Sequence, residues 1–205
     1  MKKQKKYKLK GSLQISGDKS ISHRSLILSS MAIGKAKIIN LLESEDTLST
    51  IKILKALNIQ IRKEKDCWSV IGNGTNGFIQ PAEALDCGNS GTTARLMLGA
   101  VSTNPIFCTF IGDKSLSKRP MTRVTNFLNT IGAETVLTNK DYFPMTINGA
   151  DDPLPLEHRI TKASAQIKTA LILAALNTMG RTSIIETRRT RAVSYTHLTL
   201  PTIYS

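Results

Sequence analysis

A cationic, hydroxyl-rich turn stands at residues 17–24, where Gly-Asp-Lys-Ser-Ile-Ser-His-Arg runs into an apolar segment. Either Ser20 or Ser22 can cap the helix that this segment predicts, which leaves backbone N–H groups facing the turn. Lys19 adds a point charge, and Arg24 adds a planar fork that can bind two oxygens at once. These residue types at a helix N-terminus predict a binding site for a phosphate or carboxylate group. Taken alone, the stretch also fits an ordinary capped helix with solvated cations.

Two later turns have the same character. Gly-Asn-Ser-Gly-Thr-Thr at 88–93 and Ser-Ala-Gln-Ile-Lys at 164–168 each precede an apolar segment, and Lys-Arg-Pro at 118–120 adds further cations. Three helix N-termini brought together would point their N–H groups into one cleft, and Gly91 would let a ligand approach the backbone because it has no Cβ. The side chains and backbone expected there belong to Lys19, Ser20, Arg24, Asn89, Gly91, Thr92, Ser164 and Gln166.

The elements that must position these turns recur along the chain. Hydrophobic periodicity predicts helices over about 22–33, 44–57, 95–101, 123–131 and 169–179. It predicts strands over about 5–16, 36–41, 59–62, 68–71, 106–111, 134–137, 144–147 and 182–186. The segment 57–74 aligns on 131–149 at an offset of about 75, and Arg24 aligns on Arg95 at about 71. A unit of helix, strand, helix, strand and strand therefore occurs twice and begins a third time near Ser164.

The net charge of +13 calls for an anionic partner. Six of the first ten residues are Lys, which fits a solvated strand edge as easily as a nucleic-acid arm. The other cations of interest stand singly beside Gly, Ser and Thr, and aromatic residues make up only 5% of the chain. This pattern favours small anions over a nucleic acid. A basic nucleic-acid-binding module remains the alternative class, and its binding would fall steeply with salt.

The compartment follows from what the sequence lacks. No run of about 18 apolar residues and no secretory signal stand in the chain, so we expect a cytoplasmic protein without a membrane partner. Cys67, Cys87 and Cys108 are odd in number and lack Cys-x-x-Cys spacing, which argues against a disulfide framework and a zinc site. We expect them to be buried small hydrophobic residues, and we expect no metal site.

The repeat stops near residue 191. The tract 192–205 has no Lys, Arg, Asp or Glu, is rich in β-branched residues and contains a proline. It does not continue the third unit, whose second helix should start there. We interpret it as a foreign tail, and the alternative is a genuine C-terminal strand.

Four motifs in one order, at 17–24, 88–92, 118–121 and 164–168, resemble the EPSP synthase (3-phosphoshikimate 1-carboxyvinyltransferase) family. The resemblance covers about residues 5–191, which is under half of a family member. It implies an α/β (α+β) fold, namely an inside-out α/β barrel of the enolpyruvyl transferase type built from βαβαββ-like repeats and truncated to roughly one of two domains. It further implies that strands in 1–16 join a missing second domain, which carries the acid/base carboxylates, and that 17–191 form two repeats plus a partial third.

The resemblance implies transfer of the enolpyruvyl group of phosphoenolpyruvate to the 5-hydroxyl of shikimate 3-phosphate, with loss of phosphate, by a full-length monomer without a metal or organic cofactor. Lys19 would be catalytic, between the two substrates. The implied contacts of shikimate 3-phosphate are Lys19, Ser20, Arg24, Ser164, Ala165, Gln166, Thr190 and Arg191. Those of phosphoenolpyruvate are Lys19, Asn89, Gly91, Thr92, Arg119 and Gln166.

Two further expectations accompany this resemblance. The related enolpyruvyl transferase of cell-wall synthesis is the nearest alternative enzyme, although it lacks the Gly-Asp-Lys-Ser-Ile-Ser-His-Arg opening. Arg24 is expected to be exposed and to contribute little to the stability of the fold, because an exposed arginine buries only its stem. The chain's own carboxylates Asp18, Asp46 and Asp113 are interpreted as caps and loop residues.

Overall fold

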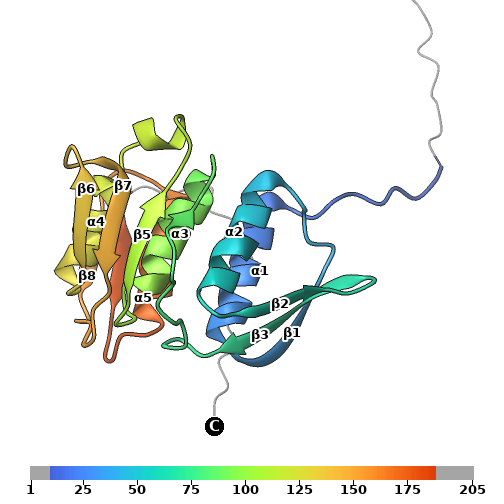
Figure 1. Ribbon diagram of the computed structural model, residues 1–205, viewed down its shortest axis with the longest axis horizontal. Coiled ribbons are helices and arrows are strands. Elements are labelled where there is room, and N and C mark those ends of the chain that lie inside the picture. Colours follow the sequence, from blue (N-terminus) through green and yellow to red (C-terminus); the bar gives the residue numbers. More distant parts are fainter. Residues whose placement is uncertain (1–9, 188–205) are drawn as a thin grey trace, which may run out of the picture.

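The computed structural model describes residues 10–187, which form three successive units (Figure 1). The first unit consists of α1 (Lys19–Met31), β1 (Ile33–Ile39), α2 (Glu45–Ala56), β2 (Gln60–Lys63) and β3 (Cys67–Asn73). The second consists of β4 (Leu85–Asp86), α3 (Gly91–Val101), β5 (Phe107–Ile111), the short 3₁₀ helix η1 (Leu116–Lys118), α4 (Thr122–Thr130), β6 (Glu134–Thr138) and β7 (Tyr142–Asn148). The third consists of β8 (Glu157–Ile160), α5 (Ala165–Ala175) and β9 (Ser183–Glu186).

The sheets repeat from unit to unit. In the first unit the strand order is β1-β3-β2, and the second unit has the same arrangement in β5-β7-β6, with antiparallel pairs throughout. The second and third units also begin with a strand that lies parallel to the strand after the helix, β4 beside β5 and β8 beside β9. The α/β class and the repeated unit expected from the sequence are therefore confirmed.

The first unit lacks such a leading strand among the described residues. The prediction of a strand over 5–16 is wrong for its described part, because residues 10–18 form neither helix nor strand. Leu13 and Ile15 are 86% and 70% exposed, so the alternating apolar side chains have no surface to cover. Ile15 nevertheless accepts a hydrogen bond from Asn40 Nδ2 at 3.2 Å, just beyond the end of β1.

Helices occupy the interior and sheets the outside. Figure 1 shows α1 and α2 packed against the β1-β3-β2 sheet, and α3, α4 and α5 behind β5 and β7. Nine of the 11 residues of α3 are buried, because this helix contacts α1, α2, α4 and α5. Gly99 makes the closest of these contacts possible, since a Cβ there would lie 2.3 Å from the Ala170 carbonyl oxygen. Outward-facing Ile33 and Val136 are 92% and 71% exposed.

Each of the three turns ends earlier than its sequence pattern predicts. The cap of α1 is Asp18, whose Oδ1 accepts a hydrogen bond from the Ile21 N–H at 2.8 Å, rather than Ser20 or Ser22. Ser90 and Ser164 cap α3 and α5 in the same way. Aspartate and serine both cap helices well, so the sequence could not decide between them. Lys19, Gly91 and Ala165 are therefore the first residues of their helices and do not lie in the preceding loops.

The predicted burial of the three cysteines is confirmed for two of them. Cys87 and Cys108 are buried, as predicted, and burial raises the pKa of the Cys108 thiol to about 12, while Cys67 is only half-buried. Residues 10–187 include no helix long and apolar enough to cross a membrane. Thr190, Arg191 and the tract 192–205 lie outside the described residues.

Candidate active site

The N-termini of α3 and α5 are joined by side chains that the sequence analysis selected. Gln166, in the first turn of α5, accepts a hydrogen bond from Arg95 Nη1 at 3.1 Å and donates one from Nε2 to Thr92 Oγ1 at 3.0 Å. Ser164 and Ala165 are half-buried immediately before it. The expected convergence of these two N-termini is thus present, and Gln166 is the residue that bridges them.

Two guanidinium groups lie over the start of α3. A Cβ added at Gly91 would lie 2.7 Å from Arg95 Nη1 and 3.3 Å from Arg119 Nη1, so glycine lets both guanidinium groups approach the backbone as they do here. Burial, together with the positive charges of Arg119 and Arg123, lowers the pKa of Arg95. The N-terminus of α3 therefore carries concentrated positive charge, and a bound anion would relieve the repulsion.

Asn89, which precedes α3, and Asp113, which follows β5, orient Arg119. Arg119 Nη2 donates to Asn89 Oδ1 at 2.7 Å, and Asn89 Nδ2 donates to Asp113 Oδ2 at 2.6 Å. Asp113 also accepts from the backbone N–H groups of Ser115 and Leu116, and these hydrogen bonds hold the pKa of its carboxyl below the usual range. Asp113 is thus a loop residue, as predicted, and it keeps Asn89 turned toward the arginine.

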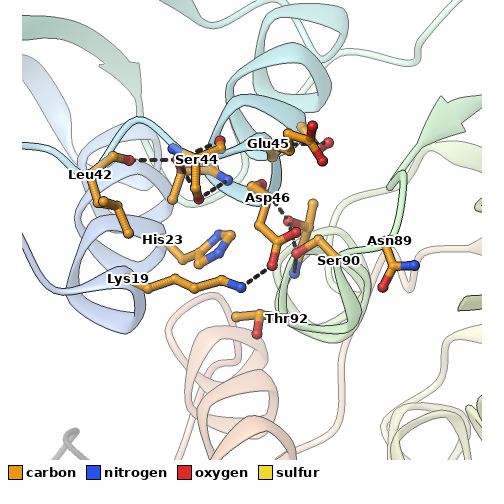
Figure 2. Close-up of polar contacts among 12 residues, drawn as sticks. Lys19, His23, Leu42, Ser44, Glu45, Asp46, Asn89, Ser90 and Thr92 are labelled. Atoms are coloured by element: carbon orange, nitrogen blue, oxygen red, sulfur yellow. Dashed lines mark hydrogen bonds and ion pairs between the residues drawn. The ribbon is translucent and has the colours of Figure 1, made fainter.

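Lys19 and Asp46 form an ion pair across the first turns of α1 and α2, as Figure 2 shows. The Lys19 side chain is 49% exposed, and that of Asp46 is 22% exposed. Ser44 caps α2 and forms a capping box with Thr47, so Asp46 lies in the first turn of the helix. The interpretation of Asp46 as a cap or loop residue is therefore wrong. The sequence could not decide between Ser44 and Asp46, because serine and aspartate both cap helices well. The Asp46 carboxylate holds the ammonium of the residue expected to be catalytic.

Arg24 is buried, so the expectation of an exposed side chain is wrong. Only 7% of the residue is exposed. Its Nη1 donates to the Ser20 carbonyl at 3.0 Å, its Nη2 donates to Thr169 Oγ1 at 2.8 Å, and its buried Nε has no partner among residues 10–187. The fork therefore joins α1 to α5, and Ser20, on the same turn, is half-buried. Burial lowers the pKa of Arg24.

Sequence reasoning missed His23, which lies between two selected residues of the first motif. The side chain is fully buried, and its Nδ1 lies 2.8 Å from Thr50 Oγ1 on α2. Burial is the main cause that lowers the pKa of His23 to about 4, so the imidazole is neutral near pH 7. A histidine in a cationic turn carries no signal that separates a solvated charge from a buried neutral ring.

The chain is similar in sequence to known proteins. The family model described as EPSP synthase (3-phosphoshikimate 1-carboxyvinyltransferase) matches residues 3–201. A 3-phosphoshikimate 1-carboxyvinyltransferase from Novosphingobium aromaticivorans is 48% identical over 184 residues, which cover 89% of this chain and 42% of that protein. One from Ruegeria sp. is 50% identical, with 89% and 41% covered. This chain thus spans about two fifths of the length of these curated relatives.

Solved structures agree with these matches. EPSP synthase from Acinetobacter baumannii superposes with a TM-score of 0.84 at 36% identity, covering 88% of this chain and 41% of that one. The enolpyruvyl transferase NikO from Streptomyces tendae shares the fold, with a TM-score of 0.56 at 13% identity, covering 84% and 39%. The expected enolpyruvyl transferase fold is therefore confirmed. The family match runs into the tract 192–205, and the interpretation of that tract as foreign stays a prediction.

Proposed function

The chain belongs to the EPSP synthase family, and we propose that it supplies one half of the active site of a 3-phosphoshikimate 1-carboxyvinyltransferase. The complete enzyme would transfer the enolpyruvyl group of phosphoenolpyruvate to the 5-hydroxyl of shikimate 3-phosphate and release phosphate. Because the chain spans about two fifths of its curated relatives, we assign turnover to a protein of their full length and anion binding to this chain.

One observation carries the proposal. The N-termini of α3 and α5 meet through Gln166, and the guanidinium groups of Arg95 and Arg119 lie beside Gly91 at the start of α3. Helix N-termini and planar forks are suited to carboxylates and phosphates, which are the groups that both substrates carry. Side-chain charge and backbone N–H groups would thus both face an anion bound at these N-termini.

Phosphoenolpyruvate would lie against the start of α3. Arg119 would bind its carboxylate or phosphate through the fork, and the backbone of Gly91 would approach the ligand closely. Asn89 would orient Arg119 through their hydrogen bond, and Thr92 and Gln166 would complete the contacts. The bound anion would offset the repulsion that the neighbouring arginine charges create at this N-terminus.

Shikimate 3-phosphate would lie between α1 and α5. Ser20, Ser164, Ala165 and Gln166 would contact it, and Arg24 would offer the buried guanidinium already held by Thr169. Thr190 and Arg191 stay predicted contacts of the same substrate.

Lys19 would act between the two substrates. In the proposed reaction the 5-hydroxyl oxygen bonds to the central carbon of phosphoenolpyruvate and gives up its proton, while the terminal CH₂ takes up a proton to form a tetrahedral adduct. Loss of phosphate and of a proton from the resulting methyl group then restores the double bond. The ammonium group of Lys19 stabilises negative charge on the phosphate as it leaves, and Asp46 keeps that group in place until the substrates bind.

Titration of this chain tests the half-site. We expect shikimate 3-phosphate to shift the backbone amide resonances of Lys19, Ser20 and Gln166 in nuclear magnetic resonance spectra, with no release of phosphate from phosphoenolpyruvate. Turnover by the chain alone, or no shift at these positions, would contradict the proposal. Binding to a DNA duplex or single strand that falls steeply with salt would instead favour a basic nucleic-acid-binding module.

A further inference from the structure

Buried hydroxyl groups connect His23 of α1 to the cap of α3. Thr50 Oγ1, which lies 2.8 Å from His23 Nδ1, is also 2.8 Å from Thr93 Oγ1, and that oxygen is 2.7 Å from Ser90 Oγ. The four residues are between 0% and 1% exposed. Figure 2 shows the His23 ring beside Lys19 and Asp46, between α1 and α2. This hydroxyl relay therefore crosses from α1 through α2 to α3, within the walls of the proposed site.

The chemistry of the acceptors favours one direction for these hydrogen bonds. The Asp46 carbonyl oxygen, which can only accept, lies 3.1 Å from Thr93 Oγ1 and 3.4 Å from Thr50 Oγ1, and Ser90 Oγ lies 2.7 Å from Thr93 Oγ1. With the Thr93 proton directed to Asp46 or Ser90, Thr93 accepts from Thr50; whether the Thr50 proton is directed to Thr93 or to Asp46, Thr50 accepts from the Nδ1–H of His23. The buried Nε2, which has no partner within the described part of the chain, is then an unprotonated acceptor. Buried N–H groups without an acceptor are rarer than buried acceptors without a donor.

We propose that His23 is a positioning residue for the anion site, acting as the Nδ1–H tautomer through the relay of Thr50, Thr93 and Ser90. This inference rests on the proposed function. The relay fixes α1, which carries Lys19, against α3, which carries Gly91. Hydrogen bonds weaken steeply with distance and angle, so a small shift of either N-terminus would weaken the contacts to a bound phosphate.

Isosteric substitution separates this role from a general contribution to folding. Thr50→Val keeps the shape of the side chain and breaks the relay, whereas Thr50→Ser keeps the hydroxyl. Thr125→Val is the matched control, because Thr125 on α4 is buried and its hydroxyl has no hydrogen-bond partner among residues 10–187. We expect Thr50→Val to weaken phosphoenolpyruvate binding by this chain about tenfold, because this ligand would contact both Lys19 on α1 and Gly91 on α3. Thr50→Ser and Thr125→Val should stay near the unsubstituted affinity.

A second readout does not depend on the ligand. Nitrogen-15 spectra of the imidazole should show His23 with a protonated Nδ1 and an unprotonated Nε2, and the opposite tautomer would overturn the direction of the relay. Equal phosphoenolpyruvate affinity in Thr50→Val and the unsubstituted chain would overturn the positioning role alone. No binding by the unsubstituted chain would overturn the proposed function, and the positioning role with it. A loss of affinity in Thr125→Val as large as in Thr50→Val would assign both effects to folding.

Discussion

Arg24 of α1 donates a hydrogen bond to Thr169 of α5 at 2.8 Å, across 145 positions of the sequence. The first and last helices of the described fold are thereby joined at the proposed site for shikimate 3-phosphate. If Arg24 also binds substrate, as proposed, it links affinity to stability. This relationship replaces the expectation that Arg24 is a solvated side chain serving the ligand alone.

Arg24→Ala should destabilise the chain as well as weaken binding. The substitution leaves Thr169 without its donor and removes a charged group that is only 7% exposed. Hydrogen bonds to charged groups contribute about 1.5–3 kcal/mol, so we expect the free energy of unfolding to fall by about 2 kcal/mol. Urea denaturation measures this change. A loss below about 0.5 kcal/mol, as for neutral surface substitutions, would show that the contact to α5 contributes nothing.

Gly91→Ala should weaken phosphoenolpyruvate binding without loss of stability. The added Cβ would lie 2.7 Å from Arg95 Nη1, so the flexible guanidinium has to move, while alanine loses less backbone conformational freedom on folding than glycine. We expect affinity for phosphoenolpyruvate to fall about tenfold and the melting temperature to stay level or rise. Calorimetric titration with each substrate supplies the control, since shikimate 3-phosphate should bind with nearly unchanged affinity. An unaltered affinity for phosphoenolpyruvate would remove Gly91 from its site.

Stability should fall between pH 7 and pH 5 because of His23. Its pKa is lowered from 6.5 to about 4 in the folded chain, chiefly by burial, with Lys19 and Arg24 acting in the same direction and Asp46 opposing them. As the pH falls below 6.5, the unfolded chain takes up a proton that the folded chain does not, so the unfolded state gains. The expected loss by pH 5 is about 2 kcal/mol.

Chemical denaturation across this pH range checks the assignment to His23. The loss should shrink in His23→Gln, whose side chain does not titrate. His158→Gln is the control, since burial also lowers the pKa of His158, and this variant should retain most of the loss. An unchanged pH dependence in His23→Gln would assign the effect to other groups.

The repeat was predictable because each unit carries its own periodic apolar pattern and its own Gly or Asn ending. The two-residue strand β4 was not, because it is too short to show alternation. Within the site, residue types and spacing predicted that Gln166 would lie near the α3 N-terminus, whereas Arg119 was expected there from the family resemblance; both side chains lie beside that N-terminus. The burial of Arg24 and the location of His23 depend on Thr169 and Thr50, which are distant in sequence. No local pattern encodes such partners.

If residues 10–187 form half of an EPSP synthase active site, as proposed, they should support turnover when the other half is supplied. This is tested by phosphate release from a chimera in which these residues replace the matching segment of the Novosphingobium aromaticivorans relative. We predict phosphate release that requires both phosphoenolpyruvate and shikimate 3-phosphate and that falls by about a hundredfold or more in Lys19→Ala. A folded chimera that binds shikimate 3-phosphate but releases no phosphate, or one whose turnover is unaffected by Lys19→Ala, would contradict the proposed half-site.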